Sequence, residues 1–178
     1  CITALLSSLT MHYCTAIPLP SPAFLPQSKA QLKNAVEACL KLSPQGYCPN
    51  GIHGAIGAWD VSRVADMSSM FSYAKLFNGD LSRWDVSRAK DTTSMFLAAT
   101  SFSSDISRWD VSRVTAMSSM FRWATSFNGD ISKWDVSRVT NMDYMFNDAT
   151  LFKQQLCGAA WVHSKAKKTK MFAGSSGS

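Results

Sequence analysis

Apolar and polar residues recur along most of this chain with a period of 25 residues. The repeated segment is Trp-Asp-Val-Ser-Arg, which starts at Trp59, Trp84, Trp109 and Trp134. Its first three residues alternate between apolar and polar, as in a strand that buries one face. The alternation predicts a short strand in which Trp84 and Val86 point inward and Asp85 points outward.

A second apolar motif, Met-x-x-Met-Phe, follows in each repeat, for example from Met117 to Phe121. Its spacing of three and four predicts one or two helical turns facing the interior. Units of this kind stack on one another, so the predicted fold class is an α/β repeat solenoid, leucine-rich-repeat-like, with 25-residue coils of short strand plus short helix. The expected repeat core consists of Trp59, Trp84, Trp109, Trp134, Phe71, Phe96, Phe121 and Phe146.

A separate helix is predicted in front of the repeats. Ser28 is a candidate N-cap and Gln31 stands three residues later, which is a capping-box spacing. Apolar residues from Leu32 to Leu40 recur at steps of three and four. We expect this N-terminal capping helix to cover the first coil, because an end coil has no neighbour to bury its core.

These patterns divide the chain into four parts. Residues 1–27 are an extended N-terminal arm with a Pro-rich connector, 28–50 the capping helix and a loop, 51–156 the repeat solenoid, and 157–178 a C-terminal cap and tail. Residues 1–17 contain no Asp, Glu, Lys or Arg. This arm is either the remnant of a targeting segment or an element that docks on a partner. It is shorter than the roughly 20 residues that a membrane span needs.

The five cysteines lie outside the three central repeats. Cys39 and Cys48 stand nine residues apart, across the expected end of the capping helix, and are the candidate disulfide. The alternative is two buried thiols. The pairing of Cys1, Cys14 and Cys157 stays open. The chain has no Cys-x-x-Cys spacing, so we expect no zinc or redox site.

Charged residues form two further rows in the repeats. They are Asp60, Asp85, Asp110, Asp135 and Arg63, Arg88, Arg113, Arg138. Each Asp can pair with the row of Arg, or accept a hydrogen bond from a backbone N–H two residues on. We therefore interpret both rows as structural. The net charge of +6 is moderate and the arginines are matched by aspartates, so nucleic-acid binding is not expected.

Specificity in stacked repeats resides where the copies differ. The variable positions after the Met-Phe pair include Tyr73, Leu97, Arg122 and Trp123, which are the interface candidates. Aromatic residues and Arg are favoured in interface centres. The alternative is that Tyr73 and Trp123 fill gaps between coils.

The segment Phe-Asn-Gly-Asp-Ile-Ser-Lys-Trp-Asp-Val-Ser-Arg-Val-Thr-Asn-Met-Asp-Tyr-Met-Phe, residues 127–146, resembles the repeats of the BspA-like surface proteins, also described as DUF285 or mycoplasma lipoprotein-type repeats. The resemblance covers about residues 51–172, and the stretch around Cys39 to Gly57 is similar to the leader that precedes such repeats in unicellular algae. It implies a leucine-rich-repeat-like protein that is secreted or displayed on a cell surface and acts in attachment or protein binding. It implies no catalytic residues.

Catalysis needs convergent groups of unlike role, whereas the polar residues here repeat identically, so we expect no enzyme, cofactor or metal. The leading hypothesis is a non-catalytic protein-protein interaction or scaffold module. The alternative is a small accessory subunit of a larger membrane-associated assembly in an algal or protist cell, docked through its N-terminal arm. Both hypotheses expect protein partners, which in the second are a multi-subunit membrane complex, and no small-molecule substrate. The expected location is secreted or cell surface, or alternatively an organelle lumen or membrane periphery.

Overall fold

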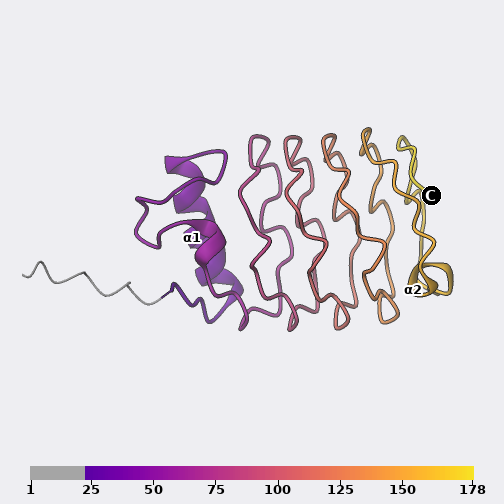
Figure 1. Cartoon of the computed structure of the whole chain (residues 1–178), viewed down its shortest axis with the longest axis horizontal. Coiled ribbons are helices and arrows are strands. Elements are labelled where there is room, and N and C mark those ends of the chain that lie inside the picture. The colour runs from indigo at the N-terminus through magenta and orange to yellow at the C-terminus, as the bar shows by residue number, and fades with distance from the viewer. Residues whose placement is uncertain (1–22) are drawn as a thin grey trace, which may run out of the picture.

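The computed structural model describes residues 23–178 and contains three short elements: α1 (Lys29–Leu42), η1 (Ile56–Ala58) and α2 (Ala159–Val162). Between α1 and α2 the chain winds through coils that lie side by side along the long axis (Figure 1). We call residues 51–75, 76–100, 101–125 and 126–150 coils 1 to 4, and residues 151–178 coil 5. The arm expected at residues 1–17, with Cys1 and Cys14, lies outside the described residues.

The expected α/β solenoid, with a strand and a helix in every coil, is wrong. From residue 23 to the end of the chain no sheet forms, and coils 2 to 4 contain no helix. The nearest approach to a sheet is a row of single parallel bridges that joins Asp66, Asp91, Ala116, Asn141 and Lys167. The rest of each coil consists of turns and irregular backbone.

The Met-x-x-Met-Phe segment is not helical because its backbone bonds to the next coil. An α-helix needs each N–H to donate four residues back. Instead, the N–H of Phe96 donates to Met120 O at 2.9 Å and the N–H of Ala98 to Arg122 O at 2.8 Å. Ser94 and Ala98 have φ values of 55° and 56°, in the left-handed region, which interrupts any right-handed helix.

The Trp-Asp-Val segment is not a strand because local turns take its hydrogen-bonding groups. The N–H of Trp84 donates to Leu81 O at 3.0 Å and the N–H of Ala89 to Val86 O at 2.8 Å. Trp84 and Val86 are nevertheless buried and Asp85 is exposed. The alternation of burial is therefore present without a strand.

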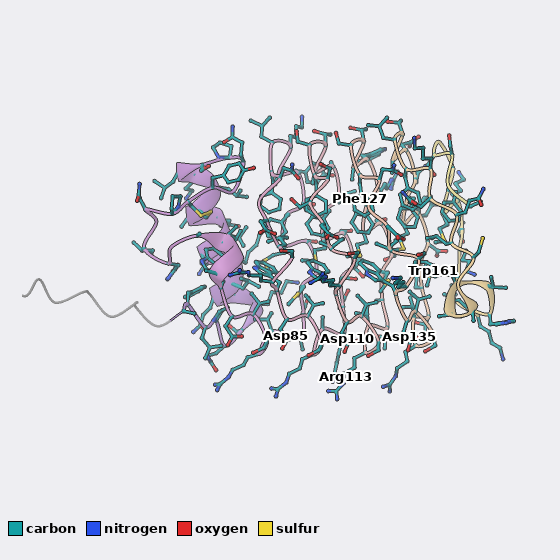
Figure 2. All side chains as sticks on the ribbon, in the orientation of Figure 1. Asp85, Asp110, Arg113, Phe127, Asp135 and Trp161 are labelled. Atoms are coloured by element: carbon teal, nitrogen blue, oxygen red, sulfur yellow. A yellow bond between two sulfur atoms is a disulfide. The ribbon has the colours of Figure 1, made fainter. Side chains whose placement is uncertain are left out.

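The tryptophans form one column of the core, and their indole N–H groups join the coils. Each donates to a carbonyl of the preceding coil: Trp84 to Ile56 at 2.9 Å, Trp109 to Leu81 at 3.0 Å and Trp134 to Ile106 at 3.2 Å. Trp161 stands 27 rather than 25 residues after Trp134, yet it donates to Ile131 O at 3.2 Å. The short helix α2 accommodates the extra residues and contains Trp161, which lies at the C-terminal end of the stack (Figure 2).

Two columns of phenylalanine rings fill the centre. The first joins Phe71, Phe96, Phe121, Phe146 and Phe172 at centroid distances of 5.4 to 5.7 Å. The second joins Phe77, Phe102, Phe127 and Phe152 at 5.9 to 6.0 Å. Rings of the two columns also stack on one another, as Phe121 does on Phe127 at 3.9 Å. The seven rings of coils 1 to 4 and Phe152 of coil 5 are fully buried, so apolar burial dominates stability.

Helix α1 covers the free face of coil 1. Ser28 caps it by accepting a hydrogen bond from the backbone N–H of Gln31 at 3.3 Å. Its buried face consists of Leu32, Ala35, Val36 and Cys39. The predicted disulfide between Cys39 and Cys48 is confirmed, and it ties the end of α1 to the following loop.

Candidate functional site

The aspartates of the row accept hydrogen bonds from the backbone of their own turns. Oδ1 of Asp85 accepts a hydrogen bond from the N–H of Ser87 at 2.9 Å, and Asp110 does the same with Ser112 at 3.0 Å. Asp60 and Asp135 repeat the arrangement. A second such turn recurs at Asp80, Asp105 and Asp130. These Asp side chains therefore shape the corners of each coil.

The arginines of the other row do not pair with these aspartates. Within residues 23–178 the ion pairs are Lys29 with Asp66 and Lys33 with Glu37. Arg113 instead extends outward past Asp110 (Figure 2). Positive and negative groups alternate along this face, which gives it no strong field of one sign.

Hydrogen bonds lower the pKa of most of these carboxyl groups. For Asp80 and Asp105 the main cause is the backbone N–H of Ser82 and Ser107, followed by the serine side chains. The pKa is also lowered at Asp60, Asp110, Asp130 and Asp135, where the serine side chain is the larger cause. The shifts follow from turn formation and do not indicate a catalytic acid.

The interface candidates lie on successive coils along one corner of the stack. The N–H of Tyr73 donates to Leu97 O at 2.7 Å, and the N–H of Trp123 donates to Asn147 O at 2.9 Å. Between them, the N–H of Ala98 reaches Arg122 O. We call Tyr73, Leu97, Arg122, Trp123 and Asp148 the variable corner.

Side chains of the variable corner form an ordered surface. The guanidinium carbon of Arg122 lies 4.2 Å from the centroid of the Trp123 ring and 5.1 Å from that of Tyr144. The Trp123 indole N–H donates to Asp148 Oδ2 at 3.2 Å. Trp123 is 37% exposed and Tyr73 is 61% exposed, while Arg122 and Leu97 are partly buried. Tyr73 therefore does not fill a gap in the core.

Each exposed residue of this corner has an unusual backbone conformation. Tyr73, Trp123 and Asp148 have φ values of 61°, 60° and 56°. Residues other than glycine rarely adopt this region, at a cost of roughly 1–2 kcal/mol each. Tyr144 and Asp148 contact these side chains but are not among the interface candidates. Asp148 is one of the variable positions of the sequence, one period after Trp123, whereas nothing in the repeat pattern indicates Tyr144.

Tyr73 also lines a groove of about 390 Å³ between α1 and coil 1, together with Lys33, Glu37 and Leu40. A second, apolar cavity of about 280 Å³ lies beside the disulfide and is lined by Leu42, Ile52, His53 and Trp59, among others. Over residues 23–178, no three or more His, Cys, Asp or Glu side chains are grouped closely enough to hold a metal ion. No helix in that range is long and apolar enough to cross a membrane.

Comparison with known proteins agrees with the resemblance seen in the repeats. The model of one protein family matches residues 47–161, which include Cys48, all four Trp-Asp-Val segments and Trp161. No curated protein and no solved structure matches the chain. The chain belongs to the family described as Mycoplasma protein of unknown function, DUF285.

Proposed function

We propose that this protein is a non-catalytic module that binds another protein through its variable corner. The observation that carries the proposal is the set of exposed Tyr73 and Trp123 rings and the Arg122 guanidinium held on one corner of a rigid stack. Aromatic residues and Arg dominate the energy of many protein interfaces. The cation–π contact and the Asp148 hydrogen bond order the surface before binding, which reduces the entropic cost of association.

A comparison of variants in affinity purification from the source cells tests this proposal. Trp123→Ala and Tyr73→Ala should each lower recovery of the same partner about 30-fold, the equivalent of roughly 2 kcal/mol at an interface hot spot. Arg113→Ala, an exposed change in the Asp and Arg face, is the matched control and should leave recovery unchanged. Unaltered recovery with both aromatic variants, at unchanged melting temperature, would refute the assignment of this surface.

The disulfide supports a location in an oxidising compartment, that is, secreted, on a cell surface or in an organelle lumen. Blocking free thiols in intact cells before lysis tests this. Cys39 and Cys48 should be recovered as a pair, and alkylation of either one would place the protein in a reducing compartment.

The second candidate function is an accessory subunit attached to a membrane-associated assembly through the uncharged residues 1–17. Phe24 is part of the folded body, because its ring stacks on His53 at 3.7 Å and its carbonyl accepts from Asp60 N at 2.9 Å. Deletion should therefore stop at residue 22. Release of this shortened chain from its complex favours attachment through the arm, whereas retention favours the variable corner.

A further inference from the structure

The backbone hydrogen bonds between the Met-Phe segments of successive coils all run in one direction. In coil 4, alternate N–H groups donate to carbonyls of coil 5: Met142 to Lys167 at 2.8 Å, Tyr144 to Thr169 at 2.8 Å and Phe146 to Met171 at 2.8 Å. Asp148 donates to Ala173 at 2.7 Å. The same set recurs between the earlier coils. Along this segment the stack therefore presents acceptors at its first coil and donors at its last coil, although bonds elsewhere, such as Thr115 N to Lys90 O at 2.8 Å, run the opposite way.

Helix α1 closes the acceptor edge with positive charge. Lys33 Nζ donates to the carbonyls of Ser69 and Met70, both at 3.1 Å. Lys29 Nζ lies 3.0 Å from a carboxylate oxygen of Asp66 and also donates to the Ser68 hydroxyl. Of these groups, the Met70 carbonyl is the equivalent of Met95 O, which accepts from Phe71 N, so a lysine ammonium replaces the backbone donor at this position.

The opposite edge has no such cover among the described residues. The positions equivalent to the donors of coil 4 are the N–H groups of Lys168, Lys170, Phe172 and Gly174. None of these four donates a hydrogen bond to any group of residues 23–178. Phe172 is partly exposed, whereas the equivalent rings of coils 1 to 4 are fully buried. We call these four residues the donor edge.

Positive charge surrounds the donor edge. Residues 149–178 contain five lysines and no Asp or Glu. Lys165, Lys167 and Lys170 are exposed, and none of them forms an ion pair within residues 23–178. Lys168 Nζ donates to the carbonyls of Trp161 and Ser164. Complementary charge favours an acidic occupant.

We propose that the donor edge binds an extended, acidic segment of a partner protein, which adds to the stack as its next rung. Its carbonyls accept from the four N–H groups, its carboxylates face the lysines, and one apolar side chain covers the Phe172 ring. Strand addition to an exposed edge uses the same combination of main-chain bonds and side-chain pockets. A second copy of this chain does not fit, since α1 covers its acceptor edge. The donor edge adjoins the variable corner at Gly174, which lies beside Asp148, but does not include Tyr73, Arg122 or Trp123.

Amide hydrogen exchange on the full chain tests the first premise. The donor-edge N–H groups lack acceptors and should exchange at least about a hundredfold faster than the hydrogen-bonded N–H groups of Met142, Tyr144, Phe146 and Asp148. The donor-edge groups are those of Lys168, Lys170, Phe172 and Gly174. Equal protection of the two sets means that the edge is already covered and overturns the proposal.

The chain itself supplies a probe for the second premise. Residues 140–149 form the rung that accepts hydrogen bonds from coil 3, and they carry Asp143 and Asp148. A fluorescein-labelled peptide of this sequence should bind the full chain and slow exchange at the four donor-edge amides. The peptide with both Asp changed to Asn should bind at least about tenfold more weakly, because the lysines then lose their charge partners. Absence of binding at millimolar peptide, or protection elsewhere, overturns the proposal.

Charge reversal separates this interaction from nonspecific attraction and from the proposed function. The triple variant Lys165→Glu, Lys167→Glu, Lys170→Glu should lose at least tenfold in affinity, while a peptide with Lys in place of both Asp should recover it. Lys75→Glu, at an exposed position of coil 1, is the control for charge reversal and should bind the peptide like the unaltered chain. Trp123→Ala should also bind the peptide normally. Equal binding by the triple variant, or dimers of the free chain in sedimentation, would contradict the acidic-segment model.

Discussion

Single aspartates define the corners of this molecule, and their ionised form is the one that accepts the serine N–H groups. At Asn141 the same turn is made by an amide, whose Oδ1 accepts from the N–H of Asp143 at 2.8 Å. The turn therefore needs an acceptor, and the carboxylates add charge to it. That difference makes stability depend on pH.

Acid should destabilise the fold through these groups. Their folded-state pKa is lowered, as at Asp80 and Asp105, so their stabilisation is complete above the unfolded pKa of about 3.9 and is lost as pH falls through the folded pKa. The midpoint of urea unfolding should fall steeply below about pH 4. Asp80→Asn and Asp105→Asn keep the acceptor and should weaken this dependence. A midpoint that is constant between about pH 2 and 5 contradicts the prediction.

The left-handed backbone at Ala98 restricts which residues the corner tolerates. Ala98→Val should lower the free energy of unfolding by about 1–2 kcal/mol, because a branched Cβ clashes with its own backbone at φ 56°. Equilibrium urea unfolding measures the loss. Ala98→Gly relieves the clash and should lose much less, and equal losses for the two variants would show that burial of the side chain, rather than backbone strain, is responsible.

At the scale of the element, the sequence predicts the period, the inward residues and the capping helix, but not the backbone path. The Trp-Asp-Val alternation fits a strand and a pair of turns equally well. Neither Gly nor Asn marks the left-handed positions Ser94 and Ala98, so nothing local indicates that the Met-Phe segment departs from a helix. The continuation at Trp161 is hidden by two extra residues. Among site residues, the variable positions could be predicted from the sequence. The donor edge could not, because it depends on the direction of the hydrogen bonds between the Met-Phe segments.

The indole column replaces part of the backbone ladder, which makes its N–H groups structural. Trp109→Phe keeps an aromatic ring in the core but removes the indole hydrogen bond to the buried Leu81 carbonyl at 3.0 Å, which then keeps only the backbone N–H of Trp84 as its donor. Loss of one such hydrogen bond costs about 0.5–1.5 kcal/mol, and we expect that decrease in the free energy of unfolding. Trp123→Phe removes an indole N–H from the exposed corner and should change stability far less. Similar losses at both positions would argue against the carbonyl contact as the cause.

At the scale of the whole molecule, each coil contacts only its neighbours, so stability is shared between successive interfaces. Phe121 lies at the middle of the stack, 5.6 Å from Phe96 and 5.7 Å from Phe146 between ring centroids. A cavity there weakens both adjoining interfaces at once. A cavity at the last coil weakens one.

Phe121→Ala should therefore lower the free energy of unfolding by about 3–5 kcal/mol. Phe172→Ala, at the partly exposed end of the same column, should cost clearly less. Chemical denaturation gives the two values, and hydrogen exchange should show the loss of protection spreading to both sides of coil 3. A loss at Phe172 as large as that at Phe121 would contradict a stack of nearest-neighbour interfaces.

Because all copies have the same number of residues, the length of the stack can change in steps of one whole copy. Duplicating or deleting one 25-residue copy moves α1 and the donor edge apart or together by one ring spacing, such as the 5.6 Å between Phe96 and Phe121, without altering either terminus of the stack. Two partners bound at opposite ends of the stack would then be separated by a distance that changes by one ring spacing per copy. The number of copies would therefore set that distance.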